Sequence, residues 1–535
     1  MKKLMILCLA FALLLSSCGA GGEEPTQSTQ ETVEQEGELP EEEQFFGMTY
    51  MPEGGFNPYT CTLTVNRAMF SLLYECLFTV SNQFRAEPVL CQSFTVSEDG
   101  KTYRFTLVEG VHFSDGTPLT ADDVVASLQA AKKSDLYSGR LAHIYSLRTD
   151  GSNVVVVRLD TAYENFSLML DVPIVKADTV NEQRPTGTGA YMVRGNSLLR
   201  NSGWWQSQVL AVSAPSIRLQ PVETPNDIRD SFEFGDTDLV YCDPNSPAAL
   251  GYRCDYEVWE VPTTVLHYIG FNVGKGIFSN KSLRTAITWG VDRETLANTV
   301  YGGFAQASVL PCSPDSDLYD TQLAADYAYS NQKLRTAIKS SGVQTSEGNS
   351  GVFLVCSDDP ARVKAAEAIN QELRKCGLYL TVKALSWENY RTALRRGNYD
   401  MYYGEVRLTA NFDLSEFFKT YGNLNLGDIG DATLSTLCTA ALENSGNYTE
   451  LCKQIIEQAP ICPVVFKSYA ICVTRGAIAS VTPAVDCIFH NAATARTLAD
   501  ADKTYDMADP TQAPTEDILT EPTESTEETQ IPAEN

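Results

Sequence analysis

The segment 351–406 restricts the fold most, because strand-like and helix-like patterns alternate there. "GVFLVC", "LYLTVKAL" and "YDMYYGEV" have the length and apolar pattern of strands. The first connection, "DDPARVKAAEAINQELRKCG", places these apolar residues on one helical face: Ala366, Ile369, Leu373 and Cys376. The second, "WENYRTALRRG", has the length of a short helix. This order predicts an α/β fold with a parallel sheet, whose ligands bind beyond the carboxyl ends of the strands.

A second local pattern covers residues 93–128 and predicts a hairpin followed by a capped helix. "SFTVSEDGKTYRFTLV" contains two alternating runs, and Asp99 and Gly100 stand at the turn between them. In "SDGTPLTADDVVASL", Thr120 suits a helix N-cap and Asp123 puts a carboxylate in the first turn. The segment contains no obvious catalytic group, so its residues indicate scaffold.

The N-terminus has the pattern of an export signal. Lys2 and Lys3 precede an apolar run, 4–15, that is too short to span a bilayer. "LSSC", ending at Cys18, resembles the bacterial lipobox, in which the signal is removed and the cysteine is lipidated. We therefore expect a signal peptide over 1–17 and a lipid anchor at Cys18 on the extracytoplasmic face of the cell membrane. The alternative is a plain secretory signal with an incidental cysteine.

The formal net charge of −28 is concentrated near the two ends. Of the 68 acids, nine fall in 19–44 and nine in 504–535, where no base occurs. Because two of the 40 bases lie in the signal, the part between keeps 50 acids and 38 bases, a net charge of −12. We expect no nucleic-acid partner, since binding phosphates needs a basic face. Segments 18–44 and 501–535 are predicted to be an acidic disordered tether and tail.

The cysteine pattern predicts neither a zinc ribbon nor a redox pair. Of fifteen cysteines, Cys8 leaves with the signal and Cys18 takes the lipid, so thirteen remain, and no Cys-x-x-Cys occurs. Most lie in apolar runs and are expected to be small buried hydrophobes. Examples are Cys76, Cys356, Cys472 and Cys487.

Several longer motifs then indicate a family. "EPVLCQSFTVSEDGKTYRFTLVEGVHFSDGTPLTADDVVASL" resembles the signature of extracellular solute-binding proteins of family 5, the oligopeptide-, dipeptide- and nickel-binding receptors of ABC importers. Further similar segments follow the family's order: "GFNPYT", "LLYECLF", "TGTGAY", "LRTAITWGVDRETLANTVYGG" and "APICPVVF". The resemblance covers roughly residues 45–495.

The resemblance implies a two-lobed clamshell of the periplasmic-binding-protein type, in the large class with an extra subdomain and with mixed sheets flanked by helices. Lobe 1 would cover 45–265, with the extra subdomain at about 85–185. Lobe 2 would cover 266–465, and 466–500 would return to lobe 1.

The implied function is that of a lipid-anchored substrate-binding protein of an ABC importer. It would bind a peptide or similar small solute between the lobes and deliver it to the permease subunits. We expect a monomer without catalysis and without a cofactor. The alternatives are a sensory or adhesive lipoprotein that works without a transporter, binding of a metal chelate such as nickel, and an exported hydrolase. The sequence contains neither the Gly-x-Ser-x-Gly nor the His-Glu-x-x-His motif that a hydrolase of those classes would have.

The resemblance also implies where ligand contacts lie. In peptide-binding members, the segment matching "MYYGEVRLTANFD", around Gly404, pairs its backbone with the peptide. The family's tryptophan after that glycine is replaced by Glu405. The family's amine-binding aspartate falls at or near Leu408, and Asp413 lies further on. At or near the amine-binding position this chain therefore has an apolar residue.

Two charged residues remain beside this position. Glu405 and Arg407 would point to the same side of a strand, because their spacing is two. One interpretation is that Glu405 meets a ligand cation and Arg407 a ligand carboxylate or phosphate. The other is an internal ion pair or a solvated rim.

Aromatic and turn residues complete the candidate ligand site. Tyr402, Tyr403 and Trp387 would supply aromatic walls, or else belong to the core. Phe56 and Asn57 of "GFNPYT" would contact the ligand from the opposing lobe, or else form an ordinary Asn-Pro turn.

No metal site is expected from the four histidines, because none forms a close ligand pair by spacing. They are His112, His143, His267 and His490.

Overall fold

The computed structural model describes residues 46–208, 214–247, 249 and 251–490, together with the backbone of 496–497. The predicted signal peptide with Cys18, the tether and the acidic tail lie outside the described residues. Within the described residues, no helix is both long and apolar enough to cross a membrane.

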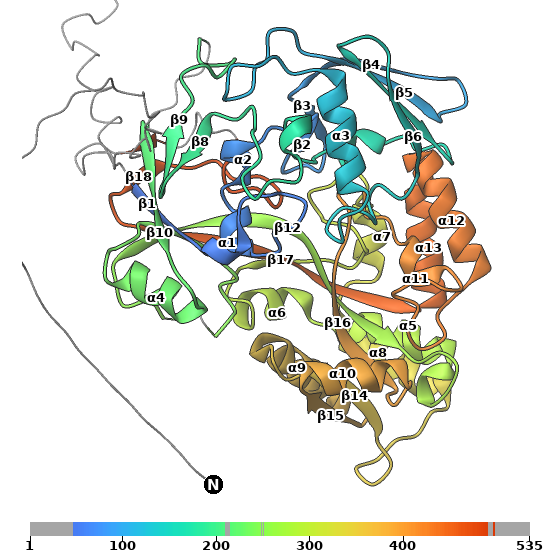
Figure 1. The fold of residues 1–535 in the computed structure, drawn as a ribbon. Coiled ribbons are helices and arrows are strands. Elements are labelled where there is room, and N and C mark those ends of the chain that lie inside the picture. Colours follow the sequence, from blue (N-terminus) through green and yellow to red (C-terminus); the bar gives the residue numbers. More distant parts are fainter. Residues whose placement is uncertain (1–45, 209–213, 248, 250, 491–495, 498–535) are drawn as a thin grey trace, which may run out of the picture. The chain divides into compact units, whose positions relative to one another are not determined.

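One mixed sheet runs through the described body in the order β15-β14-β16-β12-β17-β11-β1-β10-β9-β8, and β13 pairs with β17 (Figure 1). Its strands are β1 (Phe46–Tyr50), β8 (Tyr191–Arg194), β9 (Ser197–Arg200), β10 (Ser216–Pro221), β11 (Leu239–Cys242), β12 (Tyr256–Phe271), β13 (Ala305–Ala307), β14 (Gly351–Cys356), β15 (Leu380–Leu385), β16 (Met401–Arg407) and β17 (Ile461–Thr474). β12 and β17 are long and pair antiparallel over most of their length. The expected α/β class is confirmed.

The predicted strand-helix-strand-helix-strand segment is also confirmed. β14 is parallel to both β15 and β16, and α9 (Pro360–Lys375) and α10 (Trp387–Arg395) connect them. Alternate side chains of β14 enter different cores: Phe353 packs in the core that includes α9, and Leu354 in the core that includes Tyr390 of α10. Burial on both faces explains why the strand "GVFLVC" contains no charged or strongly polar side chain.

The helices cover two main cores. The smaller of the two contains residues from 269 to 465 only, which lies within the predicted lobe 2, and the larger takes residues from 46 to 489. The predicted lobe boundaries themselves stay a prediction. The remaining helices are α1 (Thr64–Arg67), α2 (Phe70–Leu73), α4 (Pro225–Glu233), α5 (Lys281–Gly290), α6 (Arg293–Thr299), α7 (Thr321–Asp326), α8 (Asn331–Ser341), α11 (Ser415–Phe418), α12 (Ala432–Glu443) and α13 (Tyr448–Gln458).

A separate antiparallel sheet, β4-β5-β7-β6, lies with α3 (Ala121–Ala131) in the range predicted for the extra subdomain. Its strands are β4 (Cys91–Val96), β5 (Thr102–Leu107), β6 (Ile144–Thr149) and β7 (Val154–Leu159). The predicted hairpin joins β4 to β5, and Gly100 takes the left-handed conformation with φ 66° that its turn requires. Two smaller hairpin-like pairs are β2 (Phe78–Val80) with β3 (Ala86–Pro88), and β18 (Ile478–Ser480) with β19 (Arg496–Thr497).

Asp123 is more than the predicted first-turn carboxylate of α3. Its Oδ2 accepts hydrogen bonds from the backbone N–H and the hydroxyl of Thr120, at 2.9 and 2.7 Å. Its Oδ1 accepts from the backbone N–H of Ala177 at 2.9 Å, and the side chain is buried. Asp123 therefore ties the start of α3 to the short 3-10 helix Ala177–Thr179.

We expect Asp123→Ala to lower the free energy of unfolding by about 1–3 kcal/mol, because the partly buried Ala177 N–H loses its acceptor. Asp227→Ala is the matched control, since Asp227 forms a capping box with Thr224 at the surface. That change should cost only about 0.3–1 kcal/mol. Urea denaturation followed by circular dichroism measures both, and equal losses would show that the Ala177 contact contributes nothing.

Candidate functional site

The pairing of β12 with β17 is interrupted beside Pro262, where the register shifts. Proline has no backbone N–H, so it cannot continue the ladder as a donor. Two residues on, the N–H and hydroxyl of Thr264 donate to the Asp486 carboxylate at 3.4 and 3.2 Å. The backbone N–H of Asp486 in turn donates to the Pro262 carbonyl at 2.9 Å. The interruption therefore anchors the segment that carries Asp486.

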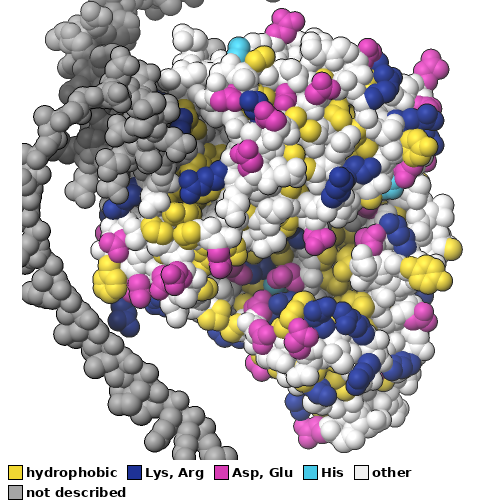
Figure 2. Space-filling view, in the orientation of Figure 1, with side chains coloured by type: hydrophobic (Ala, Val, Ile, Leu, Met, Phe, Trp, Pro, Cys, Tyr) yellow, Lys and Arg dark blue, Asp and Glu magenta, His cyan; other side chains and the backbone are white. Residues whose placement is uncertain are grey.

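A cavity of about 640 Å³ lies at this interruption, with Thr264 and Asp486 in its lining. Most of the other lining residues come from segments 62–90, 136–140, 407–410 and 485–490. Figure 2 shows the visible face hollowed above α9 and α10, with acidic and basic side chains at the hollow. The cavity volume falls within the range of about 300–1,000 Å³ that is typical of small-molecule sites.

Aromatic side chains form much of the cavity wall. They are Phe70, Tyr74, Tyr137, Trp204, Tyr241 and Tyr469. The rings of Tyr241 and Tyr469 lie 5.5 Å apart between centroids, and Tyr74 is fixed by a hydrogen bond from its hydroxyl to the Phe56 carbonyl at 2.9 Å. None of these six residues was predicted from the sequence as a ligand contact. Tyr74 belongs to "LLYECLF", one of the segments that resemble the family, and this motif could have identified it from the sequence.

Two partly exposed ion pairs lie in the cavity lining. Arg407 is paired with Asp486, and Arg140 with Asp171. Burial disfavours the charge of Arg407, but the Asp486 carboxylate more than offsets this and raises the pKa of the guanidinium. Asp486 also holds a left-handed backbone conformation with φ 57°, which its hydrogen bonds to β12 stabilise. The cavity therefore presents fixed charges whose partners are already in place.

Glu75 is a third carboxylate in the lining, and its partners are neutral. Its oxygens accept hydrogen bonds from the Thr188 hydroxyl at 2.7 Å and from the indole N–H groups of Trp204 and Trp205, the shortest at 2.8 Å. Burial raises the pKa of Glu75, while these hydrogen bonds oppose the rise. The carboxylate is thus held by uncharged donors.

Thr188 reaches Glu75 because two glycines allow a close backbone approach. A Cβ at Gly187 would lie 2.1 Å from the Leu73 carbonyl oxygen, and one at Gly189 would lie 2.4 Å from the Leu72 carbonyl oxygen. Neither contact is possible for a side chain. The "TGTGAY" motif therefore has a physical reason: it seats its backbone against the segment that ends in Tyr74 and Glu75.

Of the predicted ligand-contact residues, Arg407 lines the cavity, and so do Leu408 and Ala410 next to it. Gly404 lies inside the sheet instead, where a Cβ would meet the Tyr268 ring at 2.7 Å. The predicted segment thus contributes to the cavity through the three residues just named, not through Gly404. Backbone pairing with a peptide stays a prediction.

Glu405 does not join the cavity lining and does not pair with Arg407. Its carboxylate lies 2.8 Å from Nε2 of His267, whose Nδ1 lies 2.8 Å from the Tyr301 hydroxyl. Burial alone would raise the pKa of Glu405, but the His267 hydrogen bond and nearby positive groups lower it to about 2. His267 is fully buried, and this desolvation lowers its pKa. We therefore assign a neutral His267 that donates Nε2–H to Glu405 and accepts from Tyr301.

The three predicted aromatic walls lie outside the cavity lining. Tyr402 and Tyr403 are both buried, and their hydroxyls meet those of Tyr268 at 3.2 Å and Tyr301 at 2.9 Å. Because both faces of β16 are covered, its aromatic side chains enter the cores. Trp387 is 47% exposed at the start of α10.

Phe56 and Asn57 are buried and hold a turn. Phe56 stacks on Tyr50 at 5.7 Å between ring centroids. The Asn57 amide donates to the carbonyls of Val180 and Glu182 at 2.9 and 2.7 Å. Neither residue lines the cavity described above, so the geometry favours the interpretation as an Asn-Pro turn.

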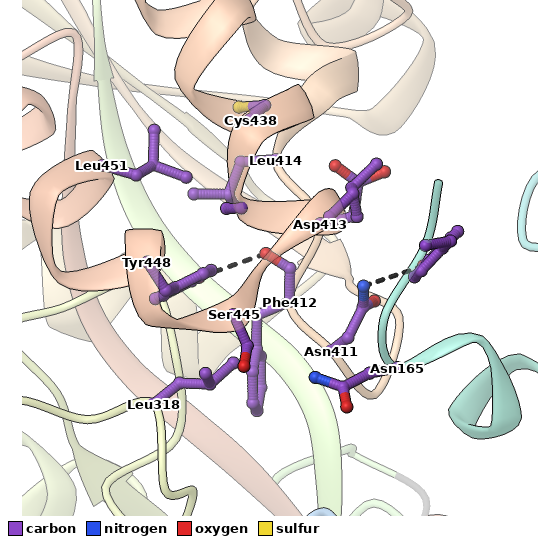
Figure 3. Close-up of a pocket in the computed structure, with 13 residues that line it drawn as sticks. Asn165, Leu318, Asn411, Phe412, Asp413, Leu414, Cys438, Ser445, Tyr448 and Leu451 are labelled. Carbon is purple, nitrogen blue, oxygen red and sulfur yellow. Dashed lines mark hydrogen bonds between the residues drawn. The ribbon is translucent and has the colours of Figure 1, made fainter. Parts of the chain in front are cut away.

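Asp413 lies in a different, much smaller pocket (Figure 3). Its Oδ1 accepts hydrogen bonds from the backbone N–H and the hydroxyl of Ser415, at 2.9 and 2.6 Å, at the start of α11. The pocket volume is about 10 Å³, near the minimum for one water molecule. Asp413 therefore acts locally, on the start of a helix, and its predicted ligand contact has no support from this pocket.

One group among the described residues has donor atoms close enough for a metal ion: His267, Asp359 and Glu405, within 4.8 Å of one another. Its donors are already engaged, because Glu405 meets His267 and Asp359 accepts from the Arg362 guanidinium at 2.9 Å. Arg362 would also repel a cation. The group therefore fits a structural charge cluster better than a metal site.

The chain is similar to a known family of bacterial proteins. The family described as "Bacterial extracellular solute-binding proteins, family 5 Middle" matches residues 85–425. The glutathione-binding protein GsiB of Salmonella paratyphi A is 25% identical over 350 residues, which are 62% of this chain and 67% of that protein. The GsiB of Escherichia coli O1:K1 is also 25% identical, with the same coverage.

Solved structures agree with the fold. The ABC transporter substrate-binding protein CtaP from Listeria monocytogenes aligns with a TM-score of 0.71 at 17% identity, covering 84% of this chain and 99% of that one. NikZ from Campylobacter jejuni, in complex with Ni(L-His), aligns with a TM-score of 0.62 at 18% identity, covering 84% and 97%. These similarities confirm the expected clamshell fold class. They show the fold alone and do not identify a ligand of this chain.

The buried His267 predicts a pH dependence of stability. Its pKa is lower in the folded than in the unfolded chain, so below about pH 6.5 the unfolded state binds more protons and stability falls as pH falls. One such group contributes at most about 1.4 kcal/mol per pH unit. We expect His267→Gln to flatten the decline of the urea midpoint between pH 7 and 5.

The control is His112→Gln, because His112 is exposed, with Nδ1 at 2.8 Å from the Gly110 carbonyl. This variant should keep the wild-type decline. If the His267 variant keeps it as well, the assignment of a neutral buried imidazole is wrong.

Proposed function

Because the chain belongs to the bacterial extracellular solute-binding proteins of family 5, we propose that it is the lipid-anchored receptor of an ABC importer, tethered through Cys18 outside the cell membrane. The observation that supports this most is the cavity of about 640 Å³ at the interruption of β12 and β17. Its walls combine aromatic rings with charged groups, which suits a solute that has both apolar and charged parts.

The proposed solute is a short peptide or a similar small molecule. The similar curated proteins are named for glutathione, a tripeptide, and one similar solved structure, AppA of Bacillus subtilis, is in complex with a nonapeptide. Peptides carry a charged group at each end and apolar side chains between, and the cavity offers guanidinium groups, carboxylates and rings.

A metal chelate is the second candidate solute, because NikZ is solved with Ni(L-His). The cavity lining contains one histidine, His490, whose Nε2 lies 3.0 Å from the Glu87 carboxylate. A chelate would therefore be held mainly through its organic part.

The proposed mechanism is a population shift without a catalytic step. A solute that touches Arg407 or Leu408 at the end of β16 and also the α1–α2 region favours the conformations in which these parts are close. The permease would then recognise that form and accept the solute. A sensory or adhesive role without a transporter would use the same cavity and the same shift.

The proposal is tested by thermal unfolding of the purified chain in the presence of a solute panel. The panel contains glutathione, di- to nonapeptides of mixed sequence, and Ni(L-His). A bound solute at 100 times its dissociation constant adds about 2.7 kcal/mol to the folded state and raises the melting temperature. If no member of the panel moves the melting temperature, the proposed solute class is wrong.

Arg407 and Glu405 should behave differently towards a peptide that binds. We expect Arg407→Ala to weaken binding by about tenfold or more, roughly 1.4 kcal/mol, because the cavity loses a donor and keeps an uncompensated Asp486 carboxylate. Glu405→Ala should leave the affinity within about twofold, since Glu405 faces His267. Isothermal titration calorimetry measures both, and similar effects of the two changes would contradict this placement.

A further inference from the structure

The charges of the cavity lining are nearly all paired with one another. Its basic side chains are Arg67, Arg140, Arg407 and His490, and its acidic ones are Glu75, Glu87, Asp171 and Asp486. Three pairs account for six of these eight groups: Arg140 with Asp171, Arg407 with Asp486, and His490 with Glu87. Glu75 and Arg67 remain.

Glu75 does not serve as the partner of Arg67. All of its contacts within the described residues are to neutral donors, namely Thr188, Trp204 and Trp205. Arg67 has no carboxylate within 4.0 Å among the described residues. It is therefore the one cation of the described cavity lining without an anionic partner.

The contacts of Arg67 orient its guanidinium without using up its donors. Nη1 lies 3.4 Å from the carbonyl oxygens of Pro58 and Cys61, and Nη2 lies 3.4 Å from the Tyr137 hydroxyl. These distances exceed the usual 2.7–3.2 Å of N–H···O hydrogen bonds, so each bond is weak. The guanidinium carbon also lies 5.8 Å from the Phe70 ring centroid and 5.7 Å from that of Tyr137.

Such an arrangement suits the binding of an anion from the cavity. Two rings hold the guanidinium plane through cation–π contacts, which leaves little side-chain freedom to lose on binding. A planar guanidinium with free donors matches a carboxylate, which it binds through two parallel hydrogen bonds. At Arg140 or Arg407, by contrast, a ligand carboxylate would have to displace Asp171 or Asp486.

We propose that Arg67 binds the carboxylate of the solute, and that the cavity therefore selects solutes with a free carboxylate group. This inference rests on the proposed function and names the chemical group by which the solute is recognised. In a peptide, the group is the C-terminal carboxylate or an acidic side chain.

The test compares a tripeptide library with free C-termini to the same sequences as C-terminal amides, all without acidic side chains. On the wild-type protein, the free acids should bind at least about tenfold more tightly than the amides in calorimetric titrations. In Arg67→Gln, acids and amides should bind alike. Arg67→Lys should keep part of the preference, because it keeps the charge but loses the planar donors.

Arg104→Gln is the matched control. Arg104 is half-exposed on β5, pairs with Asp150 and lies outside the cavity lining, so this variant should keep the full preference. Circular dichroism and urea unfolding show whether each variant folds, and the comparison on the wild-type protein needs no variant.

The role of Arg67 and the binding of peptides are contradicted by different results. If acids and amides bind the wild-type protein equally, or if Arg67→Gln keeps the preference, the role of Arg67 is wrong while peptide binding stands. If neither library binds, peptide recognition itself is wrong, and the role of Arg67 in it is wrong too.

Discussion

The antiparallel ladder between β12 and β17 is the interaction on which the rest of the structure depends. These strands carry residues of both main cores, and the sheet order passes through them from β14–β16 to β1 and β8–β11. Because Pro262 cannot donate a hydrogen bond, the ladder opens there, and Thr264 binds Asp486 in the cavity lining.

The second constraint is the number of charged side chains in the cavity wall. A charge that is partly removed from water is stabilised by a partner of opposite charge, and the wall pairs Arg140 with Asp171 and Arg407 with Asp486. Such pairs set the shape and polarity of the cavity without attracting a particular ion. Discrimination among solutes then depends on Arg67, because its guanidinium has no anionic partner. Arg140 and Arg407 are already paired with carboxylates.

Much of the fold could be predicted from sequence because its causes are local. Apolar patterns and segment lengths identified β14, α9, β15, α10 and β16, and a two-residue turn identified the β4–β5 hairpin. The site could not be predicted in the same way. Asp486 lies 79 residues from Arg407, and no pattern along the chain indicates that they meet. Tyr402 and Tyr403 appeared suitable as binding walls, yet both faces of their strand are covered. The burial of these two side chains follows from the pairing of β16 with β12 and β14, which the sequence pattern alone does not give.

The hydrogen bonds of Glu75 have a practical consequence. Two of the five tryptophans of the chain share this one carboxylate, and the indole of Trp204 also belongs to the cavity wall. Indole emission responds to the polarity and hydrogen bonding of the ring's surroundings. Trp204 is thus an intrinsic fluorophore in the cavity lining, so entry of a solute can be followed by tryptophan fluorescence without a label.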